Sequence, residues 1–387
     1  MIRFVKDSAA TLLLRLFILL LSPGLIFAGR SLRAKFLGFR ALLILGMALT
    51  VTGLYAAVEG GLLPISDYFT ALLYGTGPSF ALVVALQVGL QYATPALPID
   101  LPVGWSAFGY GVRPTFETEL TVAVENDFLG TVIGLMTRIH PLLTREQAAT
   151  IRGTLADDFN AMAERPELER LPSMLPWNLG MILPDRRQAF VYCPPHDKGE
   201  KLPLVVVCHG HGGNPLVGCL PWADLADDLG FVAAFPTFGY GNWEHPAAGL
   251  AIVKCRRAVT DRFAVDETRA VLAGISQGGC GVTRGATVAK WAGLVYVSPT
   301  MEVREFAADT AFAELWTGGP VLVAQGGRDI NVKPKTVDAG VAALRAIGVA
   351  VTYVQDPDAD HFYFFEKRDE FAEQFRAWWP TAIPPAG

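Results

Sequence analysis

The feature that most constrains the fold is an alternation of short apolar runs and helix-like segments through the second half of the chain. Short apolar runs bounded by glycine or proline are typical of buried parallel strands. These runs cover residues 204–208, 231–235, 269–274, 294–297, 320–324 and 349–354. Segments with helical spacing cover residues 251–263, 336–347 and 370–379. The pattern predicts an α/β fold with a doubly wound, mostly parallel sheet, in which reactive groups lie at the carboxyl ends of strands.

The first third of the chain differs because long apolar runs dominate it. Of all 387 residues, 51% are apolar and only 18% are charged, and most of the apolar excess lies in this third. The run at residues 41–58 has no charge and roughly the length of a bilayer core, so it predicts a transmembrane helix. The run at 12–27 fits a span, an interfacial helix or a signal-peptide core. The run at 68–93 fits a span, a kinked helix or a surface-lying segment.

Positive charges between the first two runs indicate a membrane topology. Arg30, Arg33, Lys35 and Arg40 stand there with no acidic residue, which places them on the cytoplasmic side. With three spans the C-terminal half also faces the cytoplasm, the arrangement we favour, and with two it lies outside. We therefore predict a protein of the cell membrane, multi-pass or anchored. The membrane region is interpreted as an anchor that contacts lipids, rather than as a transporter or sensor.

Three segments follow from these patterns. Residues 1–110 are predicted to form a hydrophobic membrane region of two to three helices. Residues 111–185 are predicted to be a linker with a helical connecting segment, and residues 186–387 a catalytic domain. The stretch at 94–113 is rich in proline, glycine and aromatic residues, which suits a linker leaving the membrane.

One helix of the connecting segment has a recognisable start. Residues 144–163 have helical spacing, and Thr144 is followed three residues later by Gln147. This pair has the pattern of a capping box, in which each side chain accepts a hydrogen bond from the other residue's backbone.

A possible nucleophile lies between a predicted strand and a helix, in the segment Gly274-Ile-Ser276-Gln-Gly278. A serine on a tight strand-to-helix turn adopts a strained conformation that exposes its hydroxyl above the sheet. Small residues on either side let the backbone pass, and Gly274 and Gly278 fill that role. The pattern alone recurs by chance in a chain with 39 glycines, and the flanking strand and helix make it specific.

A serine hydroxyl needs a base, and this type of site supplies an acid and then a histidine later in the chain. His361 is the only histidine after Ser276, and it follows the last predicted strand. The orienting carboxylate is expected after the preceding strand, where Asp329 follows two glycines. Asp356, Asp358 and Asp360 are the alternatives, but ordinary turn chemistry explains them on the histidine's own loop.

Acyl transfer also needs backbone donors for the developing oxyanion. The segment His209-Gly-His211-Gly-Gly213 follows the strand at 204–208, as an oxyanion loop does. The expected donors are the amides of His211 and Gln277. The competing interpretation, half of a metal site at His209 and His211, is disfavoured because no further ligand cluster follows.

Charge and cysteine usage exclude other classes. A net charge of −5 gives no basic surface for a nucleic-acid backbone, so nucleic acid is not an expected partner. The five cysteines are an odd number without CxxC spacing and are interpreted as core residues rather than disulfides. They are Cys193, Cys208, Cys219, Cys255 and Cys280.

The chain resembles the α/β-hydrolase superfamily, particularly its esterase, acyl-thioesterase and dienelactone-hydrolase-like branch. The similar elements are His209-Gly-His-Gly-Gly213, Gly274-Ile-Ser-Gln-Gly-Gly279, Gly327-Arg-Asp329 and the late His361, and the resemblance covers residues 189–379. It implies hydrolysis of an ester, a thioester or occasionally a peptide bond through an acyl-enzyme, without metal or organic cofactor. The departures are the histidine at position 211 and the hydrophobic first third.

These observations lead to the expectation of a membrane-anchored serine hydrolase acting on small-molecule or lipid esters or thioesters. The alternatives are a membrane-bound serine peptidase of the same fold and a catalytically inactive, hydrolase-like binding domain. Aromatic residues near the expected site fit an acyl pocket or ordinary packing. They are Trp222, Phe238, Tyr240 and Trp243. The sequence indicates no oligomeric state.

Overall fold

The computed structural model describes six segments of the chain. They are residues 103–110, 144–163, 187–211, 214–238, 243–316 and 318–384. All of them belong to one of the two compact units into which the chain divides. The predicted membrane segments at residues 12–27, 41–58 and 68–93 lie outside the described residues. Within the described segments, no helix combines the length and the apolar character needed to cross a bilayer.

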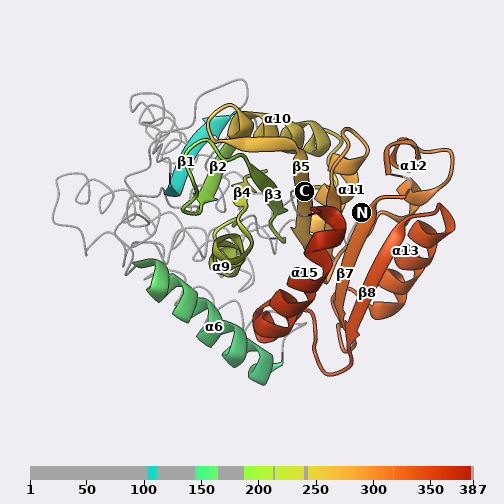
Figure 1. Cartoon of the computed structure of the whole chain (residues 1–387). Coiled ribbons are helices and arrows are strands. Elements are labelled where there is room, and N and C mark those ends of the chain that lie inside the picture. Colours follow the sequence, from blue (N-terminus) through green and yellow to red (C-terminus); the bar gives the residue numbers. More distant parts are fainter. Residues whose placement is uncertain are drawn as a thin grey trace, which may run out of the picture. The chain divides into compact units, whose positions relative to one another are not determined.

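The described unit is built on one eight-stranded sheet with the order β1-β2-β4-β3-β5-β6-β7-β8 (Figure 1). Five neighbouring strand pairs are parallel, and the two pairs that involve β2 are antiparallel. The strands are β1 (Gly104–Tyr110), β2 (Arg187–Cys193), β3 (Leu202–Cys208), β4 (Val232–Pro236), β5 (Val265–Ile275), β6 (Gly293–Val297), β7 (Pro320–Gly326) and β8 (Ala350–Asp356). The prediction of a mostly parallel α/β sheet is confirmed.

Helices pack on both faces of this sheet. The helices are α6 (Arg145–Ala163), α9 (Cys219–Leu229), α10 (Ala248–Thr260), α11 (Gly278–Ala286), α12 (Ala311–Trp316), α13 (Pro334–Ala346), α14 (Tyr363–Glu366) and α15 (Arg368–Ala382), with a 3₁₀ turn, η1, at Val303–Phe306. Alternate residues of a strand point to opposite faces. Leu294 of β6 joins the cluster that contains α10, α11 and α13, whereas its neighbour Gly293 lies against Trp378 of α15.

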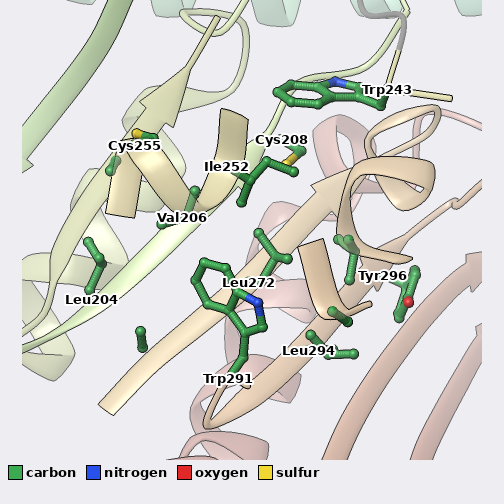
Figure 2. Close-up of a cluster of buried hydrophobic side chains, with 14 of the residues drawn as sticks. Leu204, Val206, Cys208, Trp243, Ile252, Cys255, Leu272, Trp291, Leu294 and Tyr296 are labelled. Carbon is green, nitrogen blue, oxygen red and sulfur yellow. The ribbon is translucent and has the colours of Figure 1, made fainter. Parts of the chain in front are cut away.

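One core cluster lies on the α10–α11 face of the sheet. Leu204, Val206 and Cys208 of β3 contribute alternate side chains to it, together with Leu272 of β5. Figure 2 shows these side chains packed with Ile252 and Cys255 of α10, and with Trp243, Trp291, Leu294 and Tyr296. All five cysteines of the chain are buried, as predicted for core residues.

The sheet extends further toward the N-terminus than the sequence patterns indicated. The stretch at 94–113 was interpreted as a linker and residues 1–110 as membrane region, but residues 104–110 form the edge strand β1. This strand pairs antiparallel with β2, from Gly104 opposite Cys193 to Tyr110 opposite Arg187. Aromatic residues stabilise a strand when they pack on a neighbour. Trp105 does so by contacting Tyr192 and Phe235, with ring centroids 5.1 and 6.0 Å away.

Helix α6 has the predicted start and is attached to the C-terminal part of the unit. The Thr144 amide donates to Gln147 Oε1 at 2.9 Å, and the Gln147 amide donates to Thr144 Oγ1 at 3.1 Å. Gln147 also donates from its side chain to Asp360. Further along α6, the buried Asp158 forms a bidentate ion pair with Arg368, the first residue of α15. The capping box is confirmed, and two polar contacts hold α6 near the loop before α14.

We expect the Asp158–Arg368 pair to stabilise this attachment. Replacing Asp158 by alanine leaves the partly buried guanidinium of Arg368 without its carboxylate, which should cost about 1–3 kcal/mol of unfolding free energy. Asp157→Ala, an exposed change on the same helix, should stay within about 0.5 kcal/mol of the unchanged protein. Urea unfolding of the three proteins measures both values. Equal losses for the two variants would contradict the assigned role.

Candidate active site

Ser276 occupies a strained turn between β5 and α11. Its φ of 53° lies in the left-handed region that a serine rarely adopts. Two backbone hydrogen bonds to β6 and the loop after it hold this conformation. The Ser276 amide donates to Val297 O, and the Thr300 amide donates to Ser276 O, both at 2.9 Å. The predicted strand–turn–helix context of Ser276 is therefore present.

The two flanking glycines are required by close backbone contacts. A Cβ atom on Gly274 would overlap the carbonyl of Gly278, and one on Gly278 would overlap the carbonyl of Cys208. The second contact brings the end of β3 directly against the start of α11. Glycine is needed at both positions because backbone atoms, not flexible side-chain ends, fill the space.

The structure brings Ser276, His361 and Asp329 together from three loops. His361 Nε2 lies 2.9 Å from Ser276 Oγ, and His361 Nδ1 lies 2.8 Å from Asp329 Oδ2. These are the contacts of a nucleophile, a base and an orienting acid. The Asp329 side chain is fully buried and that of His361 is only 12% exposed, so solvent competes little with either contact.

The Asp329 carboxylate accepts hydrogen bonds on both oxygens. Oδ1 accepts from the amides of Asn331 and Val332, both at 2.8 Å. Oδ2 accepts from Gln325 Nε2 at 3.1 Å, and it is also the oxygen that faces His361 Nδ1. A buried carboxylate needs such donors to offset desolvation, and here four of them surround the group.

The loops that carry the acid and the histidine are joined through their backbones. The Gly327 amide donates to Asp356 O at 2.6 Å, and the Arg328 amide donates to Ala359 O at 2.9 Å. A Cβ atom on Gly326 would overlap the carbonyl of Asp360. The glycines before Asp329 therefore allow the acid loop and the histidine loop to touch.

The alternative carboxylates on the histidine loop have other partners. Asp356 Oδ1 accepts from the amides of Asp358 and Ala359, and Asp358 pairs with Arg328. Asp360 accepts from the Phe362 amide at 2.7 Å and from Gln147. None of these contacts involves the imidazole, and Asp329 is the carboxylate that faces it.

Aromatic packing fixes the chain just after His361. Helix α14 begins two residues later, and its Tyr363 and Phe364 are buried. Phe364 stacks on Trp222 of α9 at 6.0 Å between ring centroids. Its ring also closely approaches Gly218, just before α9, where a Cβ would lie 2.8 Å from the ring edge. The histidine is thus positioned by a core contact as well as by its hydrogen bonds.

The loop after β3 lies beside the serine. A Cβ on Gly210 would be 3.6 Å from Ser276 Cβ. Trp243 donates from Nε1 to His209 O at 2.8 Å, and its ring lies 4.8 Å from the His209 ring. His211 is exposed and residues 212–213 lie outside the described segments, while Gln277 directly precedes α11. The placement of the loop agrees with the expected oxyanion site, and the donor roles of His211 and Gln277 stay predictions.

The aromatic residues considered for an acyl pocket are mostly packing residues. Trp222 is fully buried between α9, α14 and α15. Trp243 is fully buried against His209 and Phe238, which is itself nearly buried. Tyr240 lies outside the described residues. For three of the four, packing is the interpretation that the structure supports.

The two histidines of the loop differ in environment. His209 is buried and its Nδ1 lies 3.0 Å from Gly210 O, whereas His211 is exposed. Among the described residues, no group of three or more His, Cys, Asp or Glu side chains is arranged to hold a metal ion.

Two supporting contacts were not predicted from the sequence: Gln325 was not considered for the site, and Trp243 was considered only as an acyl-pocket or packing residue. Gln325 contacts the carboxylate of Asp329. Trp243 contacts the carbonyl of His209, which stands 34 positions earlier in the chain. For Gln325 a weak signal was present, since it is a polar residue inside an apolar strand, immediately before the glycine pair. The contact of Trp243 with the carbonyl of His209 depends on tertiary folding, and no local sequence pattern indicates it.

We expect Gly278→Ala to disrupt the turn. The added methyl group would overlap backbone atoms of β3, which should cost at least about 2 kcal/mol of unfolding free energy. Gly153 of α6 is a matched control, because a Cβ there meets nothing within 4 Å. Gly153→Ala should be neutral or stabilise by up to about 1 kcal/mol. Denaturant unfolding compares them, and a Gly278→Ala protein as stable as the control would refute the close contact.

His209 should make the fold sensitive to acid. Burial lowers the pKa of His209 to about 4, because desolvation penalises the charged imidazole, although its hydrogen bond to Gly210 acts in the opposite direction. The unfolded chain binds a proton near its ordinary pKa of 6.5, so stability is lost as pH falls from 6.5 toward 4. The loss of unfolding free energy between pH 7 and pH 4.5 should be about 2–3 kcal/mol smaller in His209→Gln than in the unchanged protein. Urea unfolding at both pH values measures it, and equal losses in the two proteins would contradict the burial effect.

Comparisons with known proteins find matches among solved structures only. No protein-family model matches the chain, and no curated protein matches it in sequence. A butyrate-bound esterase from the planctomycete Thermogutta terrifontis is 17% identical, with a TM-score of 0.42, over 52% of this chain and 92% of that one. A puromycin hydrolase is 19% identical, with a TM-score of 0.41, over 51% of this chain and 37% of that one.

The strongest indications of the fold family come from the chain's own geometry. A serine on a left-handed turn follows a central parallel strand, and the acid and histidine follow later strands in the order Ser276, Asp329, His361. That order and that turn characterise α/β-hydrolases. The described part of the chain therefore has the α/β-hydrolase fold.

Proposed function

We propose that the protein is a serine hydrolase that cleaves carboxylic esters or thioesters through an acyl-enzyme. The observation that carries the proposal is the continuous hydrogen-bonded series from Ser276 Oγ through His361 to the buried Asp329, at 2.9 and 2.8 Å. Backbone hydrogen bonds hold Ser276 and the Asp329 carboxylate, and packing of Phe364 holds the chain after His361, so the site is organised before a substrate arrives. Such preorganisation is what proximity and electrostatic catalysis require.

The proposed first step is attack of Ser276 Oγ on the carbonyl carbon of the substrate. His361 Nε2 removes the hydroxyl proton and then donates it to the leaving alcohol or thiol, which departs from the tetrahedral intermediate. Asp329 accepts the Nδ1 proton of His361 in a hydrogen bond, which selects the tautomer with a free Nε2 and stabilises the imidazolium. Water, activated by the same histidine, then attacks the acyl-serine and regenerates Ser276.

The oxyanion of the intermediate needs backbone donors close to Ser276. The amide of Ser276 itself donates to Val297 O. We therefore assign the amide of Gln277, at the start of α11, and the amide of His211, on the loop beside Ser276. The proximity of Gly210 to Ser276 and the Trp243 contact that holds this loop support the second assignment.

The assembled triad favours catalysis over the inactive binding domain considered from the sequence, because a binding role does not require these three contacts. A peptidase would use the same triad, so the distinction between ester and amide bonds depends on the measurement below. Membrane attachment and lipid-like substrates stay predictions from the first third of the sequence.

Kinetics on p-nitrophenyl esters test the proposal. Ser276→Ala should abolish detectable hydrolysis, and Asp329→Asn should lower kcat by about 10⁴-fold because the imidazole loses its orienting charge. Asp358→Asn is the matched control, since this exposed aspartate belongs to the histidine's loop and should leave kcat within about twofold.

Two results would contradict the proposal. Hydrolysis by Ser276→Ala at the rate of the unchanged protein would show that another group is the nucleophile. Faster turnover of matched peptide amides than of esters would replace the esterase assignment with a peptidase.

A further inference from the structure

A buried glutamine lies directly behind the acid of the triad. Gln325 is the penultimate residue of β7 and stands four positions before Asp329. Its side chain is completely buried, although the strand around it is apolar. A buried amide is costly unless it forms hydrogen bonds, so its contacts indicate what it does.

The terminal nitrogen of Gln325 is surrounded by oxygen atoms. Nε2 lies 3.1 Å from Asp329 Oδ2, 3.0 Å from Val332 O and 3.2 Å from Gly326 O. All three are acceptors, and a rotated amide would place its own oxygen against them. The hydrogen-bond chemistry therefore requires the NH₂ group at this position and makes Gln325 a donor.

These contacts fix the carboxylate from the side that the backbone does not reach. The amides of Asn331 and Val332 both donate to Oδ1, so they hold one end of the Asp329 carboxylate. Oδ2 is the oxygen that faces His361, and its second donor is Gln325. Gln325 also donates to the carbonyl of Val332, whose amide holds Oδ1, so one side chain connects the carboxylate to the turn that supports it.

We propose that Gln325 is a positioning residue for the triad, which acts by keeping Asp329 Oδ2 aimed at His361 Nδ1. Without its donor, the carboxylate can turn about the end held at Oδ1, and His361 loses the orientation that places Nε2 on the serine. This inference rests on the proposed function. It predicts an effect on the chemical step and none on substrate binding, because Gln325 is buried behind the acid.

The test uses the full chain and compares two isosteric replacements. Gln325→Met keeps the length and removes the donor. Gln325→Glu keeps the shape, but it donates to Asp329 only while it carries a proton. Gln188→Met serves as the matched control, because Gln188 is a buried glutamine of the same sheet, on β2. The readouts are kcat and KM on a p-nitrophenyl ester, and the rate of inactivation by a fluorophosphonate, which reports serine reactivity without a natural substrate.

We expect Gln325→Met to lower kcat and the inactivation rate by about 10- to 100-fold, as loss of an orienting partner typically does, with KM within about twofold. Gln188→Met should change neither. For Gln325→Glu, the activity relative to the unchanged protein at the same pH should rise as pH falls from about 9 to about 6. Burial and the adjacent Asp329 favour the protonated glutamate, which restores the donor.

Several outcomes would overturn the inference. One is a Gln325→Met protein with kcat within about threefold of the control, and another is a loss that appears in KM alone. The third is an activity of Gln325→Glu, relative to the unchanged protein at the same pH, that does not depend on pH. If Gln325→Met does not fold, the pH dependence of Gln325→Glu decides alone. Asp329→Asn separates the two claims: if it loses activity while both Gln325 variants keep theirs, only the positioning role fails. If the unchanged protein neither hydrolyses esters nor reacts with the fluorophosphonate, the proposed function fails first.

Discussion

The left-handed backbone of Ser276 is the constraint on which the rest of the site depends. Such a conformation costs a serine about 1–2 kcal/mol, and it persists only where surrounding contacts fix it. Here β6 supplies one through Val297 O, and the loop after β6 supplies another through the Thr300 amide. On the other side, β3 approaches so closely that position 278 has no room for a side chain. The same contacts that impose the strain lift the hydroxyl away from the sheet and toward His361.

A second consequence follows from the parallel sheet. The carboxyl ends of β5, β7 and β8 lie at one edge, so the loops that carry Ser276, Asp329 and His361 meet without long excursions. Backbone hydrogen bonds of Gly327 and Arg328 then join the acid loop to the histidine loop. The geometry of the triad is thus set largely by main-chain contacts, and the buried core on the α10–α11 face supports the strands that carry them.

The sequence predicted the parts of the fold that depend on local patterns. The six parallel strands were predicted to within a few residues, because each is a short apolar run bounded by turn residues. The strand-to-helix turn of Ser276 and its two flanking glycines were predicted because an exposed nucleophilic serine needs small residues at this fixed spacing. The capping box of α6 is also local, and the structure contains it.

What the sequence did not reveal depends on contacts between distant segments. Strand β1 was taken for a linker because residues 94–113 are rich in proline, glycine and aromatic residues. Its stability comes from pairing with β2, which no local pattern shows. The supporting contacts of Gln325 and Trp243 likewise exist only after the strands assemble. The predicted membrane helices lie outside the described residues and keep the status of predictions.

The proposed function requires that Ser276 is a nucleophile activated by its surroundings. Mass spectrometry after reaction with a fluorophosphonate tests it most directly, by locating the modified residue among all serines of the folded chain. We expect a single adduct on the peptide that contains Ser276, and its loss when the protein is unfolded before reaction. An adduct on another serine, or equal labelling of the folded and unfolded chain, would contradict it.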